Sequence, residues 1–151
     1  MKRRKFIVSS ALSSIALNSE DLVSRDANPV MTAAAGRKIL IAGGGFREAF
    51  IRYMAELTGK ERPRLCYLPT ASADRPSGII SWFQNCANLN VVPFVQESFI
   101  SSYRMDQSFE DVLLSMDGIV VSGGNTLNQQ AIWKVQGIDV ILKEAWDRGI
   151  V

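Results

Sequence analysis

Residues 117–127 read Asp-Gly-Ile-Val-Val-Ser-Gly-Gly-Asn-Thr-Leu, and they carry the clearest indication of the fold class. Its apolar run, Gly118–Val121, shows no polar alternation, which is typical of a strand buried on both faces. Gly123 and Gly124 end that strand, and Asn125 is suited to begin a helix over residues 126–135. A buried strand, a glycine turn and a helix together indicate a parallel α/β sheet.

The same pattern recurs on both sides of this stretch. We expect further strands at residues 38–42, 64–68 and 91–95, and helices at residues 46–58, 77–88, 108–116 and 138–148. Pro93 places its strand at an edge or a bulge of the sheet. The alternation predicts a three-layer α/β/α domain with a mostly parallel sheet, of the flavodoxin-like type. Gly149-Ile150-Val151 is expected to start another strand, so we expect a sheet that is truncated at its C-terminal side.

Residues 1–35 have the pattern of an N-terminal targeting segment, separate from the α/β domain at residues 36–151. Four basic residues, Lys2–Lys5, precede a Ser/Ala-rich apolar stretch that is too short to span a bilayer. Arg3-Arg4 followed by Phe6 is similar to a twin-arginine export signal. We expect export to the periplasm if this signal functions, with cleavage after Ala33–Ala35, and a cytoplasmic protein if it does not.

Composition excludes several classes of function. The chain has 151 residues, 47% of them hydrophobic, and its formal charge of +2 comes from the N-terminus, because residues 36–151 contain 12 basic and 12 acidic side chains. We therefore expect no nucleic-acid partner and no stable membrane insertion. The sequence contains no histidine, so neither Ser-His catalysis nor a His-based metal site can be completed within it. We expect no metal and no cofactor.

A second glycine-rich stretch, Gly43–Gly45, follows the first expected strand. It could be the start of a dinucleotide fingerprint, but Glu48 stands where the third glycine belongs. The alternative is a tight turn between strand and helix.

Residues 117–127, continued by the stretch from Ala131 to Val151, resemble the peptidase E family of serine peptidases. The resemblance extends back to Arg64-Leu-Cys-Tyr-Leu-Pro-Thr-Ala-Ser-Ala73 and to the stretch from Ile39 to Phe46, in the order found in the family. The relatives are aspartyl dipeptidases and cyanophycinases, which share a class I glutamine amidotransferase-like fold.

The resemblance implies serine-type hydrolysis of small peptides, including aspartyl peptides. It implies that Gly124 donates its backbone N–H to the oxyanion, and that Gly123 and Asn125 contribute to substrate binding, Asn125 by holding the loop or capping the next helix. The family's nucleophile would lie beyond Val151, on a strand-to-helix turn, and its base further on. We therefore expect the 151-residue chain to be inactive by itself.

Two other functions stay open: a non-catalytic module that binds amino acids or peptides in the same crevice, and an amidotransferase-like or nucleotide-binding enzyme. The sequence also leaves homo-oligomerisation open. No Ser-x-x-Lys pattern supports Ser72 or Ser122 as a nucleophile, and capping or loop hydrogen bonding is expected of both.

The remaining candidate side chains are expected to be structural. Asp74 and Arg75 are expected to be a solvated pair on the rim of the crevice. Cys66 and Cys86 are expected to be small buried groups, with a disulfide open if the protein is exported. The three tryptophans are expected to pack in the core or against the sheet: Trp82, Trp133 and Trp146.

Overall fold

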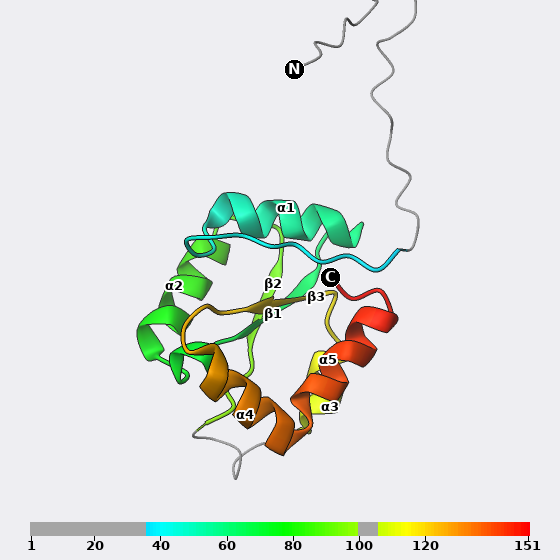
Figure 1. Ribbon diagram of the computed structural model, residues 1–151. Coiled ribbons are helices and arrows are strands. Elements are labelled where there is room, and N and C mark those ends of the chain that lie inside the picture. Colours follow the sequence, from blue (N-terminus) through cyan, green and yellow to red (C-terminus); the bar gives the residue numbers. More distant parts are fainter. Residues whose placement is uncertain (1–35, 100–105) are drawn as a thin grey trace, which may run out of the picture. The chain divides into compact units, whose positions relative to one another are not determined.

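The structure, a computed structural model, describes residues 36–99 and 106–151 (Figure 1). These residues belong to one compact unit, Ala33–Val151. The expected export signal and its cleavage site lie outside the described residues.

A parallel sheet forms the centre of the described unit. The strand β1 (Arg64–Leu68) lies between β2 (Val92–Val95) and β3 (Gly118–Val121), and both neighbours run parallel to it. Cys66 is in register with Phe94 on one side and with Ile119 on the other. The parallel order is confirmed, and Pro93 lies on an edge strand, where its missing N–H costs no ladder hydrogen bond.

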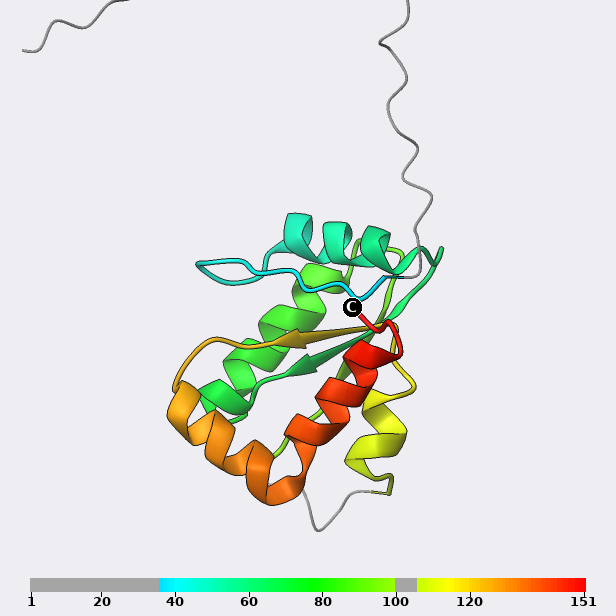
Figure 2. The ribbon, with the colours of Figure 1, turned by 45° about the vertical axis from the view of Figure 1, so that its right-hand side comes forward.

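Helices cover both faces of the sheet, which confirms the three-layer α/β/α architecture (Figures 1 and 2). One face is covered by α1 (Glu48–Thr58) and α2 (Pro76–Cys86). On the other face lie α3 (Phe109–Leu113), α4 (Thr126–Gln136) and α5 (Ile138–Asp147). A short 3-10 turn, η1 (Thr70–Ser72), follows β1.

The core is organised by the alternation of side chains along β1. Leu65 and Tyr67 point toward α1 and α2, where Tyr67 stacks on the fully buried Trp82 at 5.6 Å between ring centroids. Cys66 and Leu68 point the other way, toward α3 and α5. Because both faces of β1 are buried, its sequence is apolar throughout.

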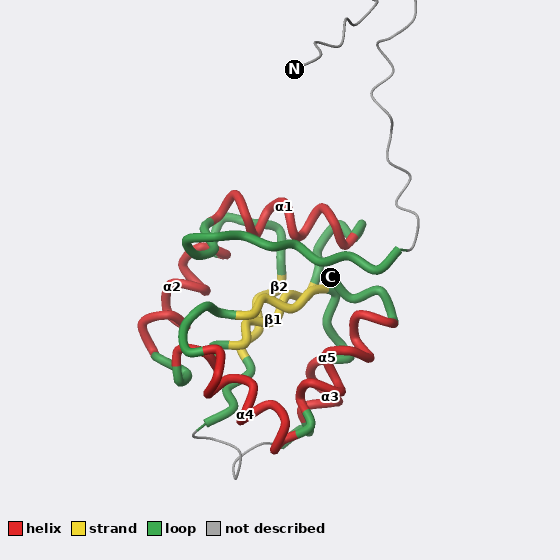
Figure 3. Tube along the Cα trace, in the orientation of Figure 1, coloured by secondary structure: helices red, strands yellow, loops and turns green. Residues whose placement is uncertain are grey.

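The prediction of a strand at residues 38–42 is wrong. The segment is extended but belongs to no sheet (Figure 3), and no backbone hydrogen bond joins residues 36–45 to the described part of the chain. Leu40 packs against the core, whereas Ile39 is 71% exposed and Ile41 is 89% exposed. A strand needs a neighbouring strand for its backbone groups, and among the described residues none lies alongside this segment.

The residues after α5 return to the sheet, as the alternation predicts. The N–H of Ile119 donates to the Val151 carbonyl at 2.7 Å, and the N–H of Val151 donates to the Asp117 carbonyl at 3.1 Å. This pair of bonds has the pattern of a parallel ladder. The chain after Gly149 therefore pairs with the outer edge of β3.

Both cysteines lie among the described residues. Cys66 and Cys86 are both free and buried, in clusters on opposite faces of the sheet, so they form no disulfide. Within the described residues, no helix has the length and apolar character needed to cross a membrane.

Candidate functional site

The candidate site is the loop that follows β3, at the carboxyl end of the parallel sheet. The N–H of Ser122 donates to the Leu68 carbonyl at 3.0 Å, which extends the β1–β3 ladder one residue beyond β3. The N–H of Asn125 donates to the Ala71 carbonyl at 2.8 Å, which ties the loop to η1. In open parallel sheets, ligands bind at this end of the strands.

Gly124 occupies a position that no other residue can take. Its φ of +147° lies in the region that favours glycine, and an added Cβ would lie only 2.2 Å from the Ala71 carbonyl oxygen. Gly123 has open space around its Cα. The close approach of two backbones therefore explains the second glycine but not the first.

The amides of Gly123 and Gly124 form no hydrogen bond with any described residue, and both glycines are exposed. Unpaired backbone N–H groups at the end of a strand, just before a helix, can donate to an external oxygen. The loop thus presents donors for a carbonyl, a carboxylate or an oxyanion.

Asn125 holds the orientation of this loop by capping α4. Its side-chain oxygen accepts a hydrogen bond from the N–H of Asn128 at 3.0 Å. N-terminal capping satisfies one of the otherwise unpaired amides of the first helical turn.

Asp74 is buried in the turn that follows η1, and the sequence expectation for it is wrong. It is 1% exposed, and its Oδ2 accepts hydrogen bonds from the N–H groups of Ser98 and Phe99, each at 2.6 Å. Its partner in the expected pair, Arg75, is exposed. Asp74 and Ala73 both have positive φ values, 51° and 55°. The signal available in the sequence was an Asp in the turn after a strand, because Asp tolerates this conformation and binds nearby amides.

A small polar network joins this turn to α4. The Ser98 hydroxyl donates to the Thr70 hydroxyl oxygen at 2.9 Å, and the indole N–H of Trp133 donates to the same oxygen at 3.1 Å. Trp133 is half-buried and packs against the core cluster on that face of the sheet, as expected, and the polar contact also ties it to η1. Trp82 is fully buried in the core on the other face.

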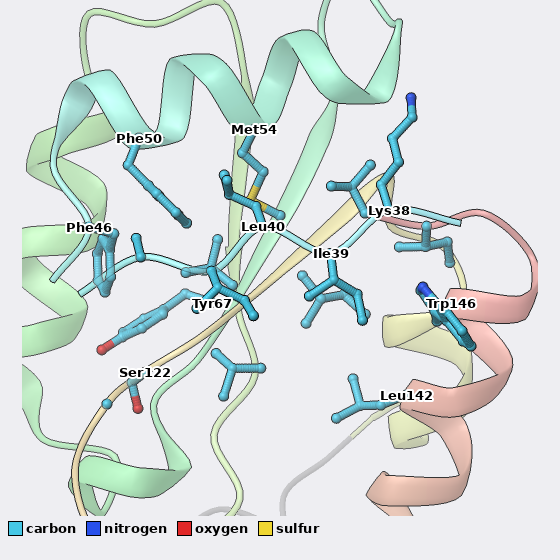
Figure 4. A pocket seen from close by; sticks show the side chains of 18 of the residues that line it. Lys38, Ile39, Leu40, Phe46, Phe50, Met54, Tyr67, Ser122, Leu142 and Trp146 are labelled. Atoms are coloured by element: carbon cyan, nitrogen blue, oxygen red, sulfur yellow. The ribbon is translucent and has the colours of Figure 1, made fainter. Parts of the chain in front are cut away.

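Neither candidate serine is hydrogen bonded to a base in the described residues. Ser72 donates its hydroxyl to the Pro69 carbonyl at 2.9 Å, a turn contact. Ser122 is buried, and it lies close to the hydroxyl end of Tyr67 (Figure 4). Burial raises the pKa of the Tyr67 hydroxyl, while the hydroxyls of Ser122 and Ser72 oppose that rise. At neutral pH Tyr67 is therefore a neutral phenol and supplies no base.

A cavity of about 730 Å³ lies beside the loop, with Ser122 and Gly123 in its lining (Figure 4). The lining is mostly apolar and comes from the Lys38–Phe46 segment, β3 and three helices. The other glycine stretch, Gly43–Gly45, is exposed and makes no backbone hydrogen bond with the described chain. No group of three or more metal-ligating side chains occurs among residues 36–99 and 106–151.

Fold and site together define an α/β domain of the kind that carries hydrolytic sites at the carboxyl end of a parallel sheet. The sequence model of Peptidase family S51, the family of peptidase E, matches residues 39–151. The chain belongs to this family, which confirms the resemblance found in the sequence.

The chain is also similar to a curated protein, the uncharacterized peptidase YgaJ of Bacillus subtilis (strain 168). The two are 36% identical over 119 residues, which is 75% of this chain and 50% of the relative. The chain thus spans about half the length of the curated relative it matches. No solved structure is a significant match to the chain.

Proposed function

We propose that this chain contributes the oxyanion-binding part of a serine-type peptidase site that hydrolyses small peptides, including aspartyl peptides. The observation that carries the proposal is the pair of unpaired, exposed amides at Gly123 and Gly124, beside a carbonyl contact that only glycine permits. Membership of Peptidase family S51 supports hydrolysis as the reaction class.

The proposed chemistry is acyl transfer. A serine hydroxyl attacks the peptide carbonyl, a base takes the hydroxyl proton, and the carbonyl oxygen becomes negative in the tetrahedral intermediate. The amide of Gly124 donates a hydrogen bond to that oxygen. Such a donor needs no rearrangement during the reaction, because its position is already fixed by β3, η1 and the cap at Asn125.

Gly123 and Asn125 are proposed to serve substrate binding. Gly123 leaves the approach to the loop open, since nothing lies within 4 Å of where its Cβ would be. Asn125 holds the start of α4, whose N-terminal end favours a negatively charged group nearby.

The 151 residues contain no histidine, and in the described part neither Ser72 nor Ser122 is hydrogen bonded to a Lys, Asp or Glu side chain. We therefore expect the chain alone to leave an aspartyl dipeptide intact. The alternative function is a non-catalytic module that binds amino acids or peptides. Saturable peptide binding without hydrolysis, by this chain alone or by the chimera described below, would favour that alternative.

The test is a chimera in which residues 36–151 are followed by the half of the YgaJ peptidase that the match leaves out. Hydrolysis of an aspartyl dipeptide is expected. Gly124→Ala keeps the N–H group, but its Cβ would clash with the Ala71 carbonyl and displace the loop, so kcat is expected to fall by about a hundredfold or more, as when an oxyanion donor is lost. Gly43→Ala is the control, because nothing lies within 4 Å of its Cβ position, and it is expected to fold and retain activity. Circular dichroism of both variants separates lost folding from lost catalysis. A folded chimera without activity would overturn the proposal.

We also propose that the N-terminal segment exports the protein, on the basis of its basic start and the apolar stretch up to Leu17. A fusion of residues 1–35 to a reporter that is active only in the periplasm tests this. Replacement of Arg3 and Arg4 by Lys is expected to abolish export, and an unaffected reporter would contradict the twin-arginine route.

A further inference from the structure

The helix α4 is joined to the turn η1 by hydrogen bonds at two separate points. At the cap of the helix, the N–H of Asn125 donates to the Ala71 carbonyl at 2.8 Å. Further along the helix, the indole N–H of Trp133 donates to the Thr70 hydroxyl oxygen at 3.1 Å. Thr70 and Ala71 are neighbours in η1, so the two bonds close a ring of contacts that begins and ends beside Gly124.

Thr70 is the centre of the contacts between this turn and the helix. It is 1% exposed, and its hydroxyl oxygen accepts hydrogen bonds from Trp133 and from the Ser98 hydroxyl, the latter at 2.9 Å. The last residue of α4, Gln136, donates from its side-chain amide to the Ser98 carbonyl at 2.9 Å. We call these four residues, Thr70, Ser98, Trp133 and Gln136, the polar clamp. The clamp ties the C-terminal half of α4 to η1 and to the chain that follows β2.

The bond of the Trp133 indole is not a general requirement of tryptophans in this fold. The indole N–H groups of Trp82 and Trp146 are buried and have no partner among the described residues. A hydrogen bond fixes a distance and a direction, and a satisfied buried polar network favours one arrangement of the elements that it joins. The Trp133 bond therefore sets where α4 lies against η1.

The arrangement set by the clamp reaches Gly124 through Ala71. The Ala71 carbonyl oxygen accepts the Asn125 N–H, and it is the atom that a Cβ at Gly124 would approach to 2.2 Å. Trp133 lies about 12 Å along the helix from Asn125. A helix held at one point can pivot about that point, whereas two points this far apart fix its axis. They also fix the direction in which the amides of the preceding loop point.

We propose that the polar clamp, through Trp133 and Thr70, positions the amides of Gly123 and Gly124 for the oxyanion. Trp133 and Thr70 are positioning residues, because each acts through Ala71 and not by contact with the substrate. The inference rests on the proposed function for the reaction, and on the contacts between α4 and η1 for the way the loop is held. Oxyanion donors must lie about 2.7–3.1 Å from the oxygen that they stabilise, and a displacement of about 1 Å can cost a factor of about a hundred in rate.

The first measurement uses the 151-residue chain alone and needs no activity. Trp133→Phe keeps an aromatic ring and removes the N–H. Hydrogen exchange of the Asn125 amide is expected to become about tenfold faster, because its bond to Ala71 loses support. Trp146→Phe is the matched control, since it removes a half-buried indole whose N–H has no partner among the described residues, and it is expected to leave this exchange rate unchanged. An unchanged rate in Trp133→Phe, or equal acceleration of the β1 amides, overturns the inference.

A pair of Thr70 variants checks the acceptor of the same bond. Thr70→Val keeps the shape of the side chain and removes the acceptor oxygen, so the Asn125 amide is expected to exchange as fast as in Trp133→Phe. Thr70→Ser keeps the hydroxyl and is expected to restore the protection. Because Thr70→Val and Trp133→Phe remove one bond from its two ends, the double variant is expected to exchange no faster than the faster single variant. Additive effects of the two substitutions overturn the inference.

The chimera of residues 36–151 with the YgaJ half tests the effect on the reaction. Trp133→Phe is expected to lower kcat by about tenfold and to leave KM within about twofold, because an oxyanion contact is made only in the transition state. Trp82→Phe, in the core on the other face of the sheet, is expected to lower the free energy of unfolding without changing kcat. An active chimera whose kcat is unchanged by Trp133→Phe overturns the inference.

The two measurements separate this inference from the proposed function. Faster exchange at Asn125 in Trp133→Phe, together with a folded chimera that leaves an aspartyl dipeptide intact, supports the positioning of the loop by the clamp and overturns the proposed hydrolysis. Hydrolysis by the chimera, together with unchanged exchange at Asn125 in Trp133→Phe, supports the proposed function and overturns the inference.

Discussion

Two stretches of this chain have nearly the same local sequence and reach different structures. Residues 38–45 and residues 118–124 are both apolar runs ended by glycines. The second forms β3 and a loop held against η1, whereas the first is an extended segment without backbone hydrogen bonds to the described chain. The difference lies in their neighbours: β3 is paired with β1 along its whole length, and the first segment has no strand beside it. Strand-forming residues become a strand only where another strand accepts their backbone groups.

The largest expected effect comes from placing one charge in each stretch. Val120→Asp is expected to unfold the protein, at a cost of more than about 4 kcal/mol, because it buries an unpaired carboxylate. Val120 is 4% exposed and Ile41 is 89% exposed, so Ile41→Asp is expected to leave the free energy of unfolding within about 0.5 kcal/mol. Urea titrations followed by circular dichroism measure both. Equal destabilisation would show that the first stretch is as well packed as β3.

The two glycine turns provide the next comparison. Gly124→Ala is expected to lower the free energy of unfolding by about 3 kcal/mol, because the backbone of Ala71 leaves no room for a Cβ. Gly44 also has a positive φ, of +84°, but nothing lies within 4 Å of its Cβ position. Gly44→Ala is expected to cost about 1 kcal/mol at most. Thermal unfolding measures the loss of stability in both variants. A larger loss in Gly44→Ala than in Gly124→Ala would contradict the prediction that the second turn is the more tightly confined.

Asp74 lies in the turn after η1, in the packed region that includes β3, and its carboxylate holds the backbone of Ser98 and Phe99. Asp74→Ala removes the acceptor of two buried or half-buried amides and is expected to cost about 2 kcal/mol. Arg75→Ala, one residue later and exposed, is the control and is expected to be neutral. Chemical denaturation measures the free energy of unfolding, and hydrogen exchange measures the protection of the Ser98 and Phe99 amides. Unchanged exchange of these amides in Asp74→Ala would show that Asp74 does not hold them.

The smallest expected effect is a change of the free energy of unfolding with pH, caused by the buried thiols of Cys66 and Cys86. Burial raises the pKa of the Cys66 thiol to about 12 and that of Cys86 to about 11. A raised pKa in the folded state means that the neutral thiol stabilises the fold below the unfolded pKa, near 9, and that this contribution is lost as pH rises to about 12. The free energy of unfolding of Cys66→Ala is expected to fall less between about pH 9 and 12 than that of the unchanged protein, because this thiol no longer titrates. Urea titrations at several pH values measure this difference, and an identical pH dependence of the two proteins would contradict this cause.

The local patterns predicted most of the described elements correctly. The apolar residues 64–68, 92–95 and 118–121 form the sheet, and Gly59 ends α1 in the left-handed conformation expected of it, with φ of 70°. These features follow from interactions within a few residues, which the sequence displays directly. The prediction failed at Asp74, because its partners Ser98 and Phe99 lie 24 and 25 residues away.

The sequence by itself determined the fold class and the parallel arrangement of the strands, because apolar periodicity and glycine positions are local properties. The family was indicated by the resemblance of its motifs and is shown by the match to Peptidase family S51. Only the tertiary structure showed that Gly124 is confined by the Ala71 carbonyl, that Asp74 is buried, and that residues 38–45 remain unpaired. Each of these features depends on which distant segments of the chain come close together in the fold. Such contacts join residues far apart in the chain, and no pattern confined to one segment specifies them.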